Sequence, residues 1–234
     1  MKLSLFQSFD RYSYKDGLKV PRWEKYKGVN VGPDGNVTEH QRTTAHTIRK
    51  YGKYDLNAGK ITLQEYQQLR ITGLLHDIPE YLGGDVSLDE KHTVSKELEK
   101  IHWNTMISRI LKGNATLISQ SDFIYQIDDN PSHPLYGVFK IYEKIGYIYG
   151  AILASKLNPS EVKNLQWLCN NVIGNNLSSL LEKIPEYPSI EYFLIDHLKE
   201  IDTIIEIGKK YQNELESKND IFKKGKKDWE NYTA

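Results

Sequence analysis

The stretch from His76 to Glu80, with the sequence HDIPE, carries the side chains best suited to chemistry in this chain of 234 residues. The imidazole of His76 and the carboxylate of Asp77 offer nitrogen and oxygen donors, which suit divalent ions such as Zn, Mn, Co, Fe or Ni. Glu80 follows His76 by four residues, so on a helix both side chains would share a face. Glu80 would then act on a metal-bound water. Pro79 lacks a backbone N–H donor and would kink or end a helix that continued through it.

Two further candidate ligands lie far from this stretch in the sequence. His40 follows Glu39 in the first turn of an expected helix, and Glu143 lies in a later, mostly apolar one. A His-Asp dipeptide alone is usually a hydrogen-bonded surface pair, and Glu143 beside Lys144 also fits a salt-bridged surface residue. The presence of all three segments favours a metal site over a surface pair.

Composition excludes several classes of protein. The 31 basic and 31 acidic residues balance, which argues against a general electrostatic grip on nucleic acid or on an anionic membrane. The single cysteine, Cys169, excludes an intramolecular disulfide and fits a reducing compartment. The first residues are too weakly apolar for a signal peptide, and no run approaches the roughly 20 apolar residues of a membrane helix. We therefore expect a cytoplasmic protein with no membrane partner and no stable nucleic-acid partner.

The hydrophobic pattern predicts an all-α protein. Thr38 and Thr62 are expected to cap helices, and residues 115–133 give no clear prediction. Residues 1–212 are expected to form one helical domain whose site-bearing core spans about residues 18–155. Residues 213–234 are charged and have little to bury, so we expect a mobile or loosely docked tail. The main helices are expected over residues 38–51, 63–76, 91–112, 134–156, 160–183 and 189–213.

The residues TEH at 38–40, LLHD at 74–77 and a carboxylate in a later helix resemble the HD-domain metal-dependent phosphohydrolases. That superfamily is named for its His…His-Asp…Asp ligand set on a helical bundle. The most similar subgroup is the bacterial HD-domain 5′-deoxynucleotidases, which remove phosphate from deoxyribonucleoside 5′-monophosphates. The local matches are the HDxxE motif ending at Glu80, the Gly-Asp pair that ends at Asp85, Lys91, and an Arg-Trp pair at Arg22-Trp23.

The resemblance implies one divalent metal ion (Mn, Co, Zn, Fe, Ni or Mg) and a role for each matching residue. Glu80 would hold or deprotonate the attacking water, and Asp85 would support the nucleotide or the water network. The metal ligands would be His40, His76, Asp77 and Glu143.

The resemblance also implies a nucleotide substrate and a homodimer. Arg22 and Trp23 would face the phosphate and the sugar and help to exclude a 2′-hydroxyl, and Lys91 would assist at the phosphate. The expected activity is therefore the removal of phosphate from (deoxy)nucleoside 5′-monophosphates by attack of a metal-bound water.

Two positions depart from the family pattern. Glu143 stands where the family has Asp, and Pro79 lies between Asp77 and Glu80, where it would change the direction of the Glu80 side chain. Two alternatives stay open. One is an HD hydrolase that acts on another nucleotide, such as a dNTP, an alarmone or a cyclic nucleotide. The other is a degenerate HD domain that binds a nucleotide without hydrolysing it.

Overall fold

The structure is a computed structural model that describes residues 22, 35–84, 96–157, 162–212 and 214–234. Within these ranges every regular element is a helix and no strand occurs, which confirms the all-α prediction. Among the same residues, no helix combines the length and the apolar character that crossing a membrane requires.

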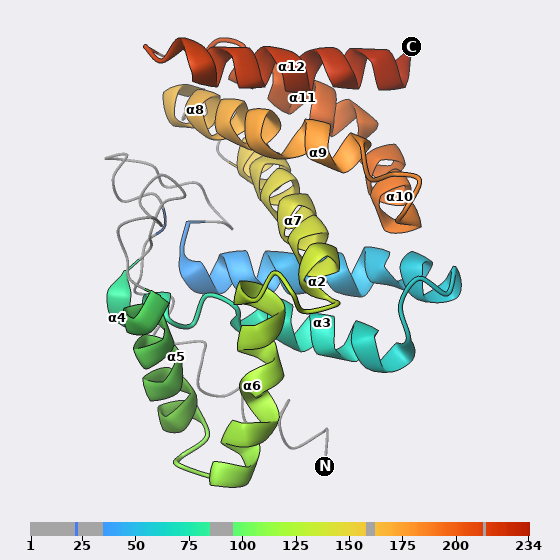
Figure 1. Ribbon diagram of the computed structural model, residues 1–234. Helices are drawn as coiled ribbons and strands as arrows, with labels where there is room; N and C mark the ends of the chain where they lie inside the picture. The colour runs from blue at the N-terminus through green and yellow to red at the C-terminus, as the bar shows by residue number, and fades with distance from the viewer. Residues whose placement is uncertain (1–21, 23–34, 85–95, 158–161, 213) are drawn as a thin grey trace.

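Helix α7 connects the two halves of the described fold (Figure 1). It packs against α2, α3 and α6 on one side and against α8, η2, α9 and α11 on the other. The helices of the first half are α2 (Val37–Asn57), α3 (Leu63–Leu75), α4 (Glu80–Gly83), α5 (Lys96–Ile110), α6 (Ala115–Asp129) and α7 (Tyr136–Leu157). Those of the second half are α8 (Val162–Val172), the π-helix η2 (Ile173–Leu177), α9 (Ser178–Leu181), α10 (Pro188–Asp196), α11 (Leu198–Gly208) and α12 (Glu216–Thr233).

Capping residues explain where the two helices nearest the candidate site begin. Thr62 and Glu65 form the reciprocal capping box of α3, which confirms the cap predicted there. The cap predicted at Thr38 is wrong, because Asn36 is the N-cap of α2 and its side chain accepts a hydrogen bond from the Glu39 N–H at 3.0 Å. Thr38 instead lies buried inside the first turn, 3.3 Å from the hydroxyl of Tyr81.

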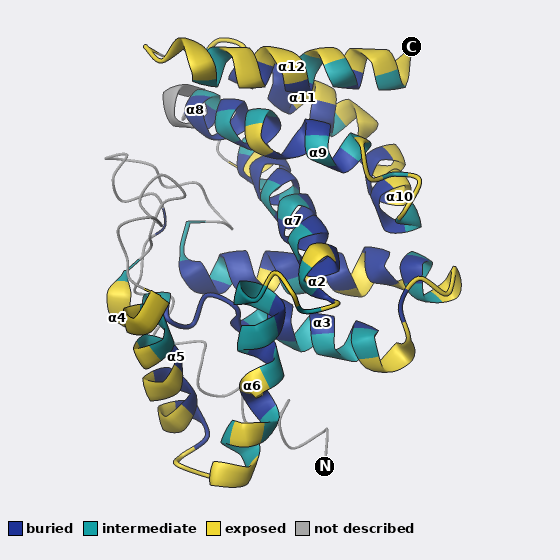
Figure 2. Cartoon of the chain, in the orientation of Figure 1, coloured by how far each residue is buried: buried dark blue, intermediate teal, exposed yellow. Residues whose placement is uncertain are grey.

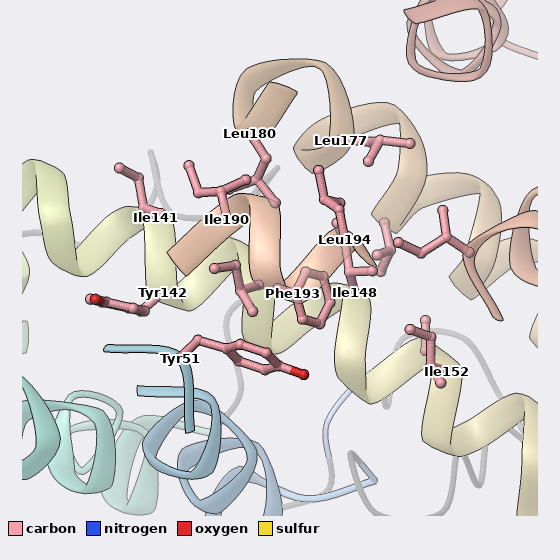
Figure 3. Packing of buried hydrophobic residues seen from close by; sticks show 14 of the residues in the cluster. Tyr51, Ile141, Tyr142, Ile148, Ile152, Leu177, Leu180, Ile190, Phe193 and Leu194 are labelled. Carbon is pink, nitrogen blue, oxygen red and sulfur yellow. The ribbon is translucent and has the colours of Figure 1, made fainter. Parts of the chain in front are cut away.

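The apolar core has two parts. The larger one surrounds α7 and includes Tyr51, Ile148 and Phe193, which Figure 3 shows packed between α2, α7 and α10. The smaller one lies between α3, α5 and α6 and includes Leu75 and Ile78. Figure 2 shows the corresponding buried faces of these helices. Because Leu75 and Ile78 flank the His-Asp pair and are almost fully buried, the smaller core fixes the backbone on which that pair sits.

Helices α2 and α7 approach closely at Gly146. A Cβ atom built there would lie 2.8 Å from Thr44 Oγ1 and 3.3 Å from Thr44 Cα. Threonine is stiff at χ1, so this neighbour yields little. The close approach matters for the site, because α2 carries His40 and α7 carries Glu143.

Replacing Gly146 with alanine should therefore push α2 and α7 apart. We expect a loss of about 1–3 kcal/mol in the free energy of unfolding, as for other overpacked cores. Urea denaturation would measure it. The matched control is Gly137→Ala on the same helix, where a Cβ meets no atom within 4 Å. That variant should gain up to about 1 kcal/mol of helix propensity, and equal effects of the two substitutions would contradict the close-approach explanation.

The last helix corrects the expectation that residues 213–234 have little to bury. Helix α12 packs on η2 and α9 through Phe222, Gly225 and Trp229. The Trp229 indole N–H donates to Asp202 at 2.7 Å, and a Cβ at Gly225 would lie only 2.8 Å from the Ile173 carbonyl oxygen. Three apolar or small residues on one helical face are enough to dock a helix whose other positions are mostly charged or polar. The charged composition of residues 213–234 does not reveal this apolar face, because the face depends on the spacing of a few residues.

Candidate metal centre

Three separate helical segments bring the predicted ligands together. His40 comes from the first turn of α2, His76 caps the C-terminus of α3, and Glu143 comes from α7. One candidate ligand atom from each of these three side chains lies within 4.8 Å of the other two. The imidazole rings of His40 and His76 meet edge to face, with their centroids 5.3 Å apart.

Asp77 lies beside both histidines. Its Oδ2 atom is 3.1 Å from His76 Nε2 and 3.7 Å from His40 Nε2. Ligand atoms that are each about 2.0–2.2 Å from a shared ion lie roughly 3–4 Å from one another. The distances from Asp77 Oδ2 to the two histidine Nε2 atoms thus match the spacing between ligands of one divalent ion.

The tautomer of His76 provides a test of whether an ion fits. Its Nδ1 atom lies 3.2 Å from the carbonyl oxygen of Gly73, which can only accept, so Nδ1 carries the proton. In the neutral ring Nε2 is then unprotonated, and its lone pair faces the Asp77 carboxylate. Two acceptors at this distance need a cation between them, either a second proton or a metal ion. A backbone carbonyl that orients the remote nitrogen is also the usual arrangement of a metal-binding histidine.

Burial makes this need for a cation stronger. His40 is fully buried, and at most 8% of His76, Asp77 or Glu143 is exposed. Burial acts to lower the pKa of His76, but the adjacent Asp77 carboxylate outweighs it and raises that pKa above its usual value. The alternative of a His-Asp pair on the surface is therefore wrong.

Glu143 is held by two neighbours on its own helix. Lys140 Nζ lies 2.8 Å from Glu143 Oε2, and the Tyr147 hydroxyl donates to Glu143 Oε1 at 3.4 Å. Lys140 also donates to Asp128 at the end of α6, at 2.8 Å. Burial acts to lower the pKa of Lys140, but Asp128 and Glu143 together raise it well above its usual value. Lys140 is therefore a cation that contacts a candidate ligand.

Tyr147 links Glu143 to two other candidate residues. Its ring stacks on the His40 imidazole with centroids 4.7 Å apart, and the Arg22 guanidinium carbon lies 5.4 Å from the centre of the same ring. Only 4% of Arg22 is exposed. The sequence predicted Arg22 but missed Tyr147. The available signal was its position four residues after Glu143, which places both on one helical face.

Gln41 supports the turn that carries Asp77, and sequence reasoning missed it too. With its amide oriented to satisfy its neighbours, its oxygen accepts from the backbone N–H groups of Asp77 and Ile78 at 3.3 and 3.2 Å, and its nitrogen donates to the Tyr81 hydroxyl at 2.6 Å. Because Gln41 follows His40 directly, this contact ties the two histidine-bearing segments together.

Glu80 is placed differently from the sequence expectation. Helix α3 ends at Leu75, so residues 76–79 form a turn and Glu80 does not share a helical face with His76. Pro79 stands immediately before α4 with φ −56°. It is tolerated there because the first turn of a helix has no hydrogen-bond acceptor for its missing N–H. The Glu80 backbone N–H donates to the Asp77 carbonyl oxygen at 3.0 Å, and its side chain is partly buried.

Three predicted residues, Trp23, Asp85 and Lys91, lie outside the described residues. The candidate site thus consists of His40, His76, Asp77 and Glu143, with Arg22, Lys140 and Tyr147 around them and Glu80 at the start of α4. Comparisons of the chain with protein-family models, with curated proteins and with solved structures gave no match.

Proposed function

We propose that this protein is an HD-type metal-dependent phosphohydrolase that removes phosphate from (deoxy)nucleoside 5′-monophosphates. The observation that carries the proposal is the buried cluster of His40, His76 and Glu143, beside which an Asp77 oxygen lies 3.1 Å from the His76 Nε2 lone pair. These four residues, His40, His76, Asp77 and Glu143, would hold the ion in the core of a helical bundle, as ligands from separate helices do in other bundles.

Hydrolysis of a phosphate ester needs a nucleophile and neutralisation of charge on the phosphoryl oxygens. A divalent ion held here would act as a Lewis acid and lower the pKa of a coordinated water. Glu80, three residues after Asp77, would accept a proton from the attacking water, a role typically worth about 10²–10⁴-fold in rate. The Arg22 guanidinium would bind phosphate oxygens through its planar fork.

The substrate class depends on Arg22 and on the resemblance. Arg22 is the described cation that lies against the Tyr147–His40 stack. A monoester phosphate carries a terminal dianion that an arginine can bind with two hydrogen bonds. A nucleoside 5′-monophosphate presents this group beside a sugar, which in the resembling family meets the residue after the arginine, here Trp23.

Replacing Arg22 with lysine should raise KM for the monophosphate by about 10–100-fold, because one charge-assisted hydrogen bond is worth roughly 1.5–3 kcal/mol and lysine cannot form the bidentate pair. Steady-state kinetics over a range of nucleotide concentrations would measure it. Arg42→Lys, at an exposed position on α2, is the matched control and should leave KM unchanged. Equal effects of the two substitutions on KM would contradict the assignment of Arg22 as a phosphate-binding residue.

The test of the function itself is phosphate release from a panel of deoxy- and ribonucleoside 5′-monophosphates. Metal-stripped protein would be assayed with and without added Mn, Co, Zn or Mg. Release that depends on metal and favours the deoxy forms supports the proposal. If the protein binds metal and yet releases no phosphate from any monophosphate, the nucleotidase assignment is wrong, and dNTPs, alarmones and cyclic nucleotides become the next substrates to assay.

One observation favours the alternative of a binding protein without turnover. Lys140 places its ammonium group 2.8 Å from Glu143 Oε2, where it neutralises part of the charge that would attract an ion. In that case the site would bind a nucleotide through Arg22 and would take up no metal. Equilibrium metal titration separates the two functions, because the hydrolase binds one ion per chain and this binder binds none.

A further inference from the structure

We propose that Lys140 is a positioning residue that aims the Glu143 carboxylate at His40 and His76. This inference rests on the proposed metal-dependent function and adds a residue that the resemblance does not assign. It also explains how Glu143 can replace the aspartate of the resembling family. Glutamate has one more methylene and one more rotatable bond than aspartate, and contact with Lys140 would restrain that bond.

The geometry along α7 supports the restraint. Lys140 lies three residues before Glu143 and Tyr147 four residues after it, so all three side chains share one face of the helix. Lys140 holds one carboxylate oxygen at 2.8 Å and Tyr147 holds the other at 3.4 Å. A carboxylate with a different donor on each oxygen has a fixed direction.

Lys140 is itself held from more than one side. Its ammonium group contacts Asp128 at 2.8 Å, which anchors it to α6. The same group lies 5.5 Å from the centre of the Phe139 ring and 5.6 Å from that of Tyr136. Phe139 in turn packs edge to face on His76, with centroids 5.4 Å apart. A lysine fixed in this way can position a neighbour, whereas a free surface lysine cannot.

The charge balance also fits a supporting role. Asp77 and Glu143 would give the ion two negative charges, and Asp128 adds a third nearby. The positive charge of Lys140 lies between Asp128 and Glu143 and reduces their mutual repulsion. Carboxylate ligands are commonly hydrogen-bonded by such outer partners, whose loss typically weakens metal binding about 10–100-fold.

The opposite role, in which Lys140 competes with the metal for Glu143, predicts an effect of opposite sign. If Lys140 positions Glu143, removing its charge weakens metal binding. If Lys140 replaces the metal, removing its charge strengthens binding. The direction of one measured change therefore decides between them.

The experiment is isothermal titration of Mn or Zn into metal-stripped protein, with Lys140→Met compared with wild type. We expect about 10–100-fold weaker binding in Lys140→Met and recovery of most of it in Lys140→Arg, which keeps the charge. The matched control is Lys156→Met on the same helix, because Lys156 pairs with Glu200 at 2.9 Å, and its affinity should equal that of wild type.

A double-mutant cycle with Glu143→Gln shows whether the effect passes through Glu143. Lys140→Met should weaken binding far less in the Glu143→Gln background than in wild type. If Lys140→Met does not fold, Asp128→Asn serves instead, since it frees Lys140 from α6 and should also weaken binding. Unchanged or tighter binding in Lys140→Met, or an undiminished effect in the Glu143→Gln background, overturns this inference alone. Absence of metal binding by wild type overturns the proposed function and the inference with it.

Discussion

Replacing Asp77 with asparagine should abolish metal-dependent phosphate release. Asp77 Oδ2 lies 3.1 and 3.7 Å from the Nε2 atoms of His76 and His40, so in the proposed site Asp77 would be the carboxylate that joins the two imidazoles at one ion. Asparagine keeps the size but removes the negative charge. The loss of rate should exceed the roughly 10–100-fold that follows removal of a partner that only supports a ligand. Steady-state phosphate release and metal content per chain would both be measured.

The control for this variant is Asp122→Asn, which removes a carboxylate that is 59% exposed and pairs with Lys100 at 3.2 Å. It should retain full activity and a full complement of metal. Thermal unfolding of the stripped proteins would show that Asp77→Asn still folds. Metal-dependent release by Asp77→Asn at the wild-type rate would contradict the ligand set as a whole.

Replacing Asp55 with alanine should cause the largest loss of stability. Asp55 is fully buried where α2, α7 and α10 meet, and it accepts a hydrogen bond from the Ser189 backbone N–H at 2.9 Å and a short one from the Tyr142 hydroxyl. Burial, with the Asp55 carboxylate beside it, raises the pKa of Tyr142 well above its usual value, so the hydroxyl stays a donor. Removal of the Asp55 carboxylate leaves the Tyr142 hydroxyl and the Ser189 N–H unsatisfied, at roughly 1–3 kcal/mol each. We expect the free energy of unfolding to fall by about 3–5 kcal/mol in total.

Urea denaturation of Asp55→Ala and Tyr142→Phe would test this network. Tyr142→Phe should cost less, about 1–2 kcal/mol, because Asp55 still accepts from Ser189. Asp122→Ala is the exposed control and should change the free energy of unfolding by less than about 1 kcal/mol. A loss below 1 kcal/mol in Asp55→Ala would show that the three helices do not depend on this carboxylate.

Local signals accounted for much of the helical fold. The capping box at Thr62 and Glu65 and the apolar face of α7 are readable because they depend on residues three or four positions apart. Other features depend on what lies opposite a helix. Residues 115–129 form α6 although their own pattern gave no clear prediction, and the expected helix over 160–183 is divided by the π-helix η2.

In the candidate site, too, some features could be predicted from local sequence and others depend on how the helices pack. The sequence named His40, His76, Asp77 and Glu143. The structure brings ligand atoms of His40, His76 and Glu143 within 4.8 Å of one another and places Asp77 beside the two histidines. The spacing of Tyr147 four residues after Glu143 places both on one helical face, but the stacking of the Tyr147 ring on His40 depends on how α2 crosses α7 and could not be predicted. Helical periodicity tells which residues share a face, but the helix that packs against that face is decided by packing across the whole domain.

The most direct test of the account is a crystal structure of Mn-loaded protein with anomalous diffraction data. If the proposed metal centre exists, one anomalous peak per chain should appear, bounded by His40, His76, Asp77 and Glu143, with Lys140 still in contact with Glu143. The absence of a peak at this position, or a peak bounded by other residues, would contradict the central claim that these four side chains form a metal centre.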